Sequence, residues 1–244
     1  WGIRMPYRTL VRLVNYKYLI FIFFIFINNT YAEELIISKY KYHLYKGNIH
    51  FGSSEQTLFK NGSTYKFDIK SNSAGIFKLK KDDRLETTNF IKDNGVIKPI
   101  SYKFIKEKRD SSQLIETIFS LDNNYAYTVE NNNKQEHIDI PYSLDRLSVQ
   151  IDFQEKMKSG IFEYKYNIID KGRLRKYAFI LHSDAILETV FGETNTIVIK
   201  KLIENNKRST LTWYAVDYDF IPVKIEQYRK NSLVFTVILD KVYR

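Results

Sequence analysis

Hydrophobic and polar side chains alternate along most of this chain. In the segment FEYKYNII, Phe162, Tyr164, Tyr166 and Ile168 occupy every second position, with charged or polar residues between them. Successive side chains of a strand point to opposite faces, so this period of two predicts a half-buried β-strand. The same alternation recurs in segments that begin at Tyr40, Ile197, Leu211 and Leu233. The pattern therefore predicts strand after strand.

Turn-forming residues separate the predicted strands. Groups rich in Asn, Asp and Gly lie at 61–63, 93–95, 122–124, 131–133, 170–172 and 205–206. Asn and Gly tolerate the positive φ of tight turns, so Lys171-Gly172 and Asn205-Asn206 are predicted hairpin turns.

One segment, YSLDRLSVQIDFQEKMK after Pro141, departs from the alternation and predicts a helix. Its apolar face is formed by Leu144, Leu147, Ser148 and Ile151. Ser143 is the predicted N-cap, and Asp145 and Arg146 are expected to face solvent. A second, shorter helical turn is predicted within 75–81.

These elements predict a mainly β fold. About ten to twelve antiparallel strands form a curved sheet, a barrel or half-barrel, because a sheet of that size curls. The one helix covers its open side, since the apolar face of a sheet must be buried. We expect a single β-barrel-like domain over residues 33–244.

The first 32 residues have the layout of a secretory signal peptide. Basic residues come first, the apolar run Tyr18–Ile27 follows, and Thr30 and Ala32 place small side chains before a cut. A membrane-spanning helix needs about 20 apolar residues, which is twice this run. We expect cleavage after Ala32 and export to the periplasm, with an uncleaved, tethered form as the alternative.

Composition narrows the function classes. The chain has no cysteine, which excludes disulfides, thiolate metal sites, a thiol nucleophile and a lipid-modified N-terminal cysteine. The formal net charge is +10, but the basic residues are spread along the chain. Nucleic-acid-binding proteins show a clustered basic stripe, so no nucleic-acid partner is predicted. Peripheral contact with a membrane surface stays open.

Several segments together resemble a bacterial family of exported proteins catalogued as domain of unknown function 3108. They are YKYHLYKGNIHFG (40–52), SLDRLSVQ (143–150), NIIDKGRLRKYAF (167–179), ETVFGETNTIVIKK (188–201) and TLTWYAVDYDFIPVKIEQ (210–227). The resemblance implies an envelope protein with a curved antiparallel sheet, similar to lipocalin-like or lipoprotein-carrier folds. It implies no reaction.

The sequence contains two polar clusters that could suggest catalysis or metal binding, but neither has the spacing that such a site requires. His182, Ser183 and Asp184 are consecutive on a predicted strand, where Ser183 points away from its neighbours, so they cannot form a triad. Asp217 and Asp219 share one side of an extended segment but are typical of a solvated turn. No catalytic residue, metal site or cofactor is predicted.

The 19 Tyr and 17 Phe residues suggest a different role. Tyr and Trp have a large apolar body with a polar tip, which suits the lining of a hydrophobic pocket, although aromatic residues also favour strands in general. The candidate ligand-lining residues are Tyr40, Tyr42, Phe162, Tyr164, Tyr166 and Trp213. A barrel filled by its own side chains makes the same residues plain core.

Three functions remain open at this stage. The leading hypothesis is non-catalytic binding of a lipid, an acyl chain or a lipoprotein moiety in the concavity of the sheet. The second is a scaffolding role with an envelope protein as partner. The third is an envelope hydrolase that acts on glycan or lipid.

Overall fold

The computed structural model describes residues 1–2, 34–79, 81–120, 122 and 124–243. The chain divides into two units between Glu33 and Glu34, and the second unit holds every described helix and strand. Apart from its first two residues, the predicted signal segment 1–32 lies outside the described residues, and so does its cleavage site. Among the helices that are described, none is long and apolar enough to cross a membrane.

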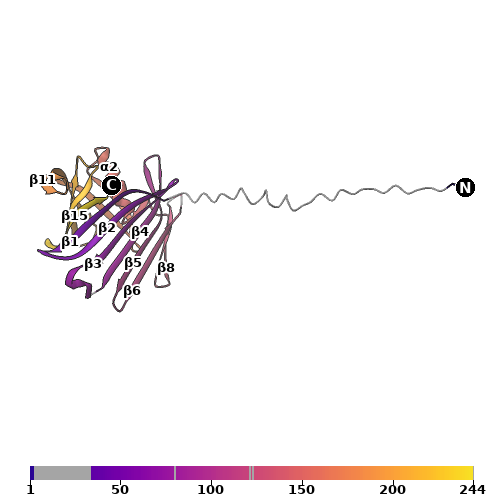
Figure 1. Cartoon of the computed structure of the whole chain (residues 1–244), viewed down its shortest axis with the longest axis horizontal. Helices are drawn as coiled ribbons and strands as arrows, with labels where there is room; N and C mark the ends of the chain where they lie inside the picture. The colour runs from indigo at the N-terminus through magenta and orange to yellow at the C-terminus, as the bar shows by residue number, and fades with distance from the viewer. Residues whose placement is uncertain (3–33, 80, 121, 123, 244) are drawn as a thin grey trace. The chain divides into compact units, whose positions relative to one another are not determined.

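The second unit is built on one antiparallel sheet (Figure 1). Its first eight strands are β1 (Leu35–Lys46), β2 (Ile49–Asn61), β3 (Thr64–Ser73), β4 (Asp82–Asp93), β5 (Val96–Lys108), β6 (Ser112–Phe119), β7 (Tyr125–Glu130) and β8 (Asn133–Ile138). The other seven are β9 (Ser143–Asp145), β10 (Tyr164–Asp170), β11 (Arg173–Thr189), β12 (Gly192–Ile203), β13 (Arg208–Ala215), β14 (Ile221–Arg229) and β15 (Ser232–Tyr243). The two helical elements are the 3₁₀ turn η1 (Gly75–Leu79) and the helix α2 (Ser148–Lys158).

The order of the strands makes two meanders that meet in the middle of the sheet. Strands β8 to β1 lie in reverse chain order, β1 pairs with β15, and β15 to β9 continue in reverse order. All neighbours are antiparallel except β9 and β10, which are parallel. The ends of the sheet are therefore β8 and β9, and hydrogen bonds do not close it into a barrel.

The predicted class, a mainly β curved sheet with one helix, is confirmed, but the described residues form 15 strands instead of ten to twelve. The additional strands are short and lack alternation. In β8, only His137 is buried, and β9 has three residues, all of them buried. A periodicity argument cannot detect strands of this kind.

Both predicted hairpin turns are present. Lys171 and Gly172 join β10 to β11 with φ values of 51° and 73°, and Asn205, with φ 55°, lies between β12 and β13. The predicted turn within 75–81 is η1.

The predicted start of the long helix is wrong. Ser143 and Leu144 belong to β9 and pair with Asn167 and Ile168 of β10, so α2 begins only at Ser148. Ser143 is therefore not the cap. Asp145, expected to face solvent, is fully buried. Backbone pairing with β10 overrides the local helical spacing.

Helix α2 packs against the inner side of the curved sheet. Val149, Phe153 and Met157 are at most 1% exposed, and the ring of Phe153 stacks on Phe179 of β11 with 4.4 Å between centroids. The large core cluster joins these residues to side chains from both halves of the sheet, such as Phe104 of β5 and Ile168 of β10. The helix thus fills one part of the concavity and connects the two meanders.

Replacing Phe153 with alanine tests this role of the helix. We expect Phe153→Ala to lower the free energy of unfolding by about 3–5 kcal/mol, because a fully buried aromatic ring is lost and a void remains. The measurement is urea unfolding followed by circular dichroism. Ile186→Ala, at a side chain that is 64% exposed, is the control and changes stability by less than about 1 kcal/mol. Equal losses in both variants contradict the proposed packing.

Candidate functional site

A buried carboxylate organises the entry into α2. Asp145 Oδ1 accepts hydrogen bonds from the backbone N–H groups of Leu147 (2.8 Å) and Ser148 (3.0 Å). In return, the Asp145 N–H donates to Ser148 Oγ at 3.0 Å. This reciprocal arrangement resembles a capping box, which satisfies backbone donors at the start of a helix.

The same carboxylate connects the helix entry to the opposite half of the sheet. Asp145 Oδ2 accepts hydrogen bonds from Ser148 Oγ and from Thr88 Oγ1 of β4, both at 2.7 Å. Burial raises the pKa of Asp145, and its hydrogen bonds from Ser148, Thr88 and Leu147 act against that rise. The many donors are the reason why a carboxylate is tolerated at this depth.

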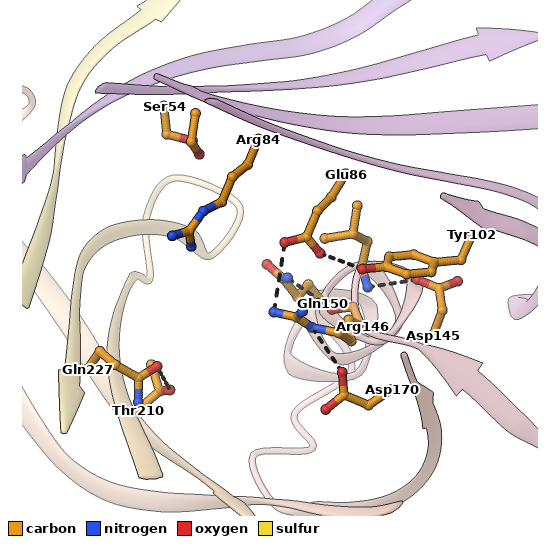
Figure 2. Close-up of polar contacts among 12 residues, drawn as sticks. Ser54, Arg84, Glu86, Tyr102, Asp145, Arg146, Gln150, Asp170, Thr210 and Gln227 are labelled. Atoms are coloured by element: carbon orange, nitrogen blue, oxygen red, sulfur yellow. Dashed lines mark hydrogen bonds and ion pairs between the residues drawn. The ribbon is translucent and has the colours of Figure 1, made fainter. Parts of the chain in front are cut away.

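Arg146 forms a second connection beside the first. Its guanidinium lies 3.8 Å from the Glu86 carboxylate of β4 and 3.4 Å from the Asp170 carboxylate of β10. Figure 2 shows Arg146 between these two carboxylates, with Tyr102 O–H donating to Glu86 at 2.8 Å. The expectation that Arg146 faces solvent is therefore wrong. Together, Asp145 and Arg146 with their partners Thr88, Glu86 and Asp170 are called the polar bridge below.

Next to the polar bridge lies a cavity of about 560 Å³ inside the curved sheet. One row of side chains that line the cavity consists of cross-strand partners on neighbouring strands. Leu44 pairs with Val237, Val237 with Ile225, Ile225 with Thr212, and Thr212 with Ile199. All five residues line the cavity, and four of them are aliphatic, so we call them the apolar row.

The next row toward the hairpin turns holds three polar side chains and one phenylalanine. Phe235 pairs with Gln227, Gln227 with Thr210, and Thr210 with Lys201, and all four line the cavity. This set is called the polar row. Gln227 Nε2 already donates to the Ser209 carbonyl at 2.7 Å, and Thr210 Oγ1 lies 3.3 Å from Gln227 Oε1. Gln227 and Thr210 thus already have hydrogen-bond partners within the protein.

Strands β2 to β4 form the facing wall. Arg84 of β4 lines the cavity, and its guanidinium makes two hydrogen bonds to the Asp82 carboxylate, at 2.8 and 3.0 Å. Figure 2 shows Arg84 and Glu86 extending from this wall, and Thr210 and Gln227 on another. Within this wall, Gly52 allows β2 to lie close to β3, because a Cβ at this position would be 2.9 Å from the Asn72 carbonyl oxygen.

Aromatic side chains lie at one part of the cavity wall. The ring of Phe51 is 6.3 Å from those of both Phe77 and Phe235, in edge-to-face contacts. All three residues line the cavity. They belong to β2, η1 and β15, so the tertiary fold brings them together.

The six aromatic residues predicted to line a ligand site are not among the residues that line this cavity. Tyr42 is fully buried in a second core cluster, against which Tyr40 and Trp213 pack. Tyr166 is buried and its O–H donates to Asp152 at 2.7 Å; Phe162 packs on the large core cluster, and Tyr164 is 44% exposed. The Tyr164 ring lies 4.7 Å from that of Tyr166 between centroids, so the structure divides these six residues into two groups.

The polar clusters considered for catalysis lie outside the cavity. His182, Ser183 and Asp184 are exposed on β11, and Asp217 and Asp219 are exposed between β13 and β14. Within the described residues, no group of three His, Asp or Glu side chains is arranged to hold a metal ion.

Sequence reasoning missed Lys201, Arg84, Glu86, Arg146 and the apolar row as parts of one site. Alternation alone assigns Ile199 and Lys201 to the same face of β12, as the register confirms. Nothing in the sequence indicates that Glu86 and Asp170 meet at Arg146, because the three lie on different elements far apart in the chain.

Comparison with known proteins gives one family match and solved structures of similar fold. The model of one family, described as protein of unknown function (DUF3108), matches residues 39–238. A solved structure of a β-barrel-like protein of domain of unknown function DUF1849 from Brucella abortus is similar, with 10% identity and a TM-score of 0.53. The match covers 86% of this chain and 98% of that chain. At this identity, the likeness shows the fold alone.

A second solved structure, from Bacteroides fragilis and with a YmcC-like fold, aligns at 9% identity over 88% of this chain and 99% of that chain. Its TM-score of 0.36 is too low to support an argument. No curated protein matches the chain.

Removing Arg146 tests the polar bridge. We expect Arg146→Met to lower the free energy of unfolding by about 2–4 kcal/mol, since Glu86 and Asp170 then lose the cation they share. The triple variant Arg146→Met/Glu86→Gln/Asp170→Asn, which leaves no unpaired charge among the three, recovers at least half of this loss. Urea unfolding at pH 7 measures both effects. A single variant as stable as the wild type contradicts the polar bridge.

Proposed function

The chain belongs to the DUF3108 family of proteins of unknown function, and we propose that it binds a hydrophobic ligand, a lipid or an acyl chain, in the cavity of its curved sheet. The observation that carries this proposal is the cavity itself, about 560 Å³ in volume and adjoining the filled core. Small-molecule sites in proteins have volumes of about 300–1,000 Å³.

The lining of the cavity favours an apolar chain with a polar end. The apolar row extends over five strands from β1 to β12, and the aromatic rings of Phe51, Phe77 and Phe235 continue the apolar surface. Burial of each methylene of a ligand against such a surface contributes about 0.8 kcal/mol before the costs of binding. A chain of ten or more carbons therefore offers enough apolar surface for measurable affinity.

We propose that this binding takes place in the periplasm. The support comes from the basic start of the sequence, the short apolar run Tyr18–Ile27 and the small residues before Glu33. An exported protein in that compartment has access to envelope lipids and lipoproteins, and both carry acyl chains that could bind in the cavity.

Blocking the cavity tests the proposal directly. We expect the neutral fluorescent probe N-phenyl-1-naphthylamine to bind the purified, delipidated protein and Ile225→Trp to weaken this binding at least tenfold, because the indole fills the apolar row. Ile238→Trp, at an outward position of β15 that is 44% exposed, is the matched control and leaves binding within twofold. A probe titration read at the probe's own emission measures both. Equal binding by the two variants contradicts the site.

A natural ligand would co-purify with the protein from the cells that produce it. We expect native mass spectrometry of protein purified from the cell envelope, followed by lipid extraction, to show a bound amphiphile that Ile225→Trp fails to retain. A spectrum of ligand-free protein for the wild type counts against lipid binding.

A further inference from the structure

Lys201 is the cation of the polar row. In the part of the chain that the structure describes, its ammonium has no hydrogen bond and no carboxylate within ion-pair distance. Its recorded contact is with the ring of Tyr177 on β11, whose centroid is 5.5 Å away. Lys201 nevertheless lines the cavity, beside the apolar row.

The carboxylates near Lys201 are already engaged. Asp170 faces both Arg146 (3.4 Å) and Arg175 (3.5 Å), while Glu86 faces Arg146 and accepts a hydrogen bond from Tyr102. The Asp82 carboxylate across the cavity is paired with Arg84. Lys201 is thus a surplus cation at the polar side of a largely apolar cavity.

We propose that Lys201 binds the anionic head group, a carboxylate or a phosphate, of a single-chain amphiphile whose acyl chain lies along the apolar row. This inference rests on the proposed function and adds the class of the ligand. An ammonium has three donors and pairs with either type of anion as a compact point charge. The register places it one inward row away from the aliphatic side chains, so head and tail of one molecule reach both.

The electrostatics of the site agree with this assignment. Burial, and then the positive charge of Arg146, lower the pKa of Lys201 from its usual 10.5 to about 8, while Asp170 and Glu86 act in the opposite direction. The groups that face Lys201 are these three, the Arg84–Asp82 pair across the cavity and Tyr177, whose own pKa is raised by burial. The two carboxylates therefore offset only part of the cost of burying the ammonium beside Arg146, and the negative charge of an anionic ligand offsets more of it.

Head-group chemistry is tested with ligands of one chain length. Dodecanoate, dodecyl phosphate and neutral dodecanol each displace N-phenyl-1-naphthylamine from the delipidated protein below their micellar concentrations. We expect the wild type to bind the anions at least tenfold more tightly than dodecanol, because a hydrogen bond to a charged partner is worth more than one to a neutral partner. The better of the two anions identifies the head group as carboxylate or phosphate.

Lys201→Met removes the cation and keeps the length of the side chain. We expect this variant to lose at least tenfold in affinity for both anions and to bind dodecanol within twofold of the wild type. Lys201→Arg retains the preference for anions. Lys200→Met, at the preceding lysine on the other face of β12, is the matched control and changes nothing beyond twofold. Thermal unfolding shows whether each variant folds. Lys201→Met is expected to melt no lower than the wild type, because no carboxylate among the described residues lies within ion-pair distance of the half-buried Lys201 ammonium.

The pH dependence gives a second readout. Lys201 is charged below its pKa of about 8 and neutral well above it. The affinity of the wild type for dodecanoate, which stays ionised, therefore falls at least fivefold between pH 7 and pH 9.5. The affinity for dodecanol, and that of Lys201→Met for dodecanoate, stays constant over this range.

The outcomes separate the inference from the function on which it rests. If dodecanoate, dodecyl phosphate and dodecanol bind equally well to the wild type and to Lys201→Met, the role of Lys201 is overturned and the hydrophobic site stands. If none of them displaces the probe and the probe itself does not bind, the proposed function is overturned together with the inference. A preference for anions that Lys201→Met abolishes and Lys200→Met retains establishes the proposal.

Discussion

The polar bridge is the interaction on which the rest of the structure depends. Hydrogen bonds between strands do not join β8 to β9, so the two meanders meet through backbone pairing only at β1 and β15. Asp145 and Arg146, at the entry to α2, contact β4 through Thr88 and Glu86 and β10 through Asp170. Buried charges are costly unless they are paired, and each charged side chain of the polar bridge has a partner in it or accepts hydrogen bonds there.

The position of α2 follows from this bridge and decides where the sheet is filled. Phe153 and Met157 are held against the concave side and complete a core with residues from both meanders. Eleven residues of helix cannot cover the whole concavity. The part between β1 to β4 and β12 to β15 keeps its cavity, and the apolar row, although packed into the two core clusters on its other sides, lines that cavity.

The polar bridge also explains why, among the described residues, no carboxylate lies within ion-pair distance of Lys201. Glu86 and Asp170 are the carboxylates whose negative charge raises the pKa of Lys201, and both form ion pairs with Arg146. A folded protein tolerates one uncompensated cation at some cost in stability, and such costs are common at binding sites, where they are offset when the ligand binds. Stability and ligand preference would then be set by the same side chain.

The sequence by itself determined the strands with clear alternation, the turns at Lys171-Gly172 and Asn205-Asn206 and the presence of one helix, because these depend on local spacing and backbone preference. Only the tertiary structure decided where α2 begins, that Asp145 is buried, and that Lys201 and the apolar row share a cavity. Asp145 and Thr88 are 57 residues apart, and no local pattern relates them. Alternation shows which side chains share a face of a strand, whereas the curvature of the whole sheet and the position of the helix decide which of them remain open to a ligand.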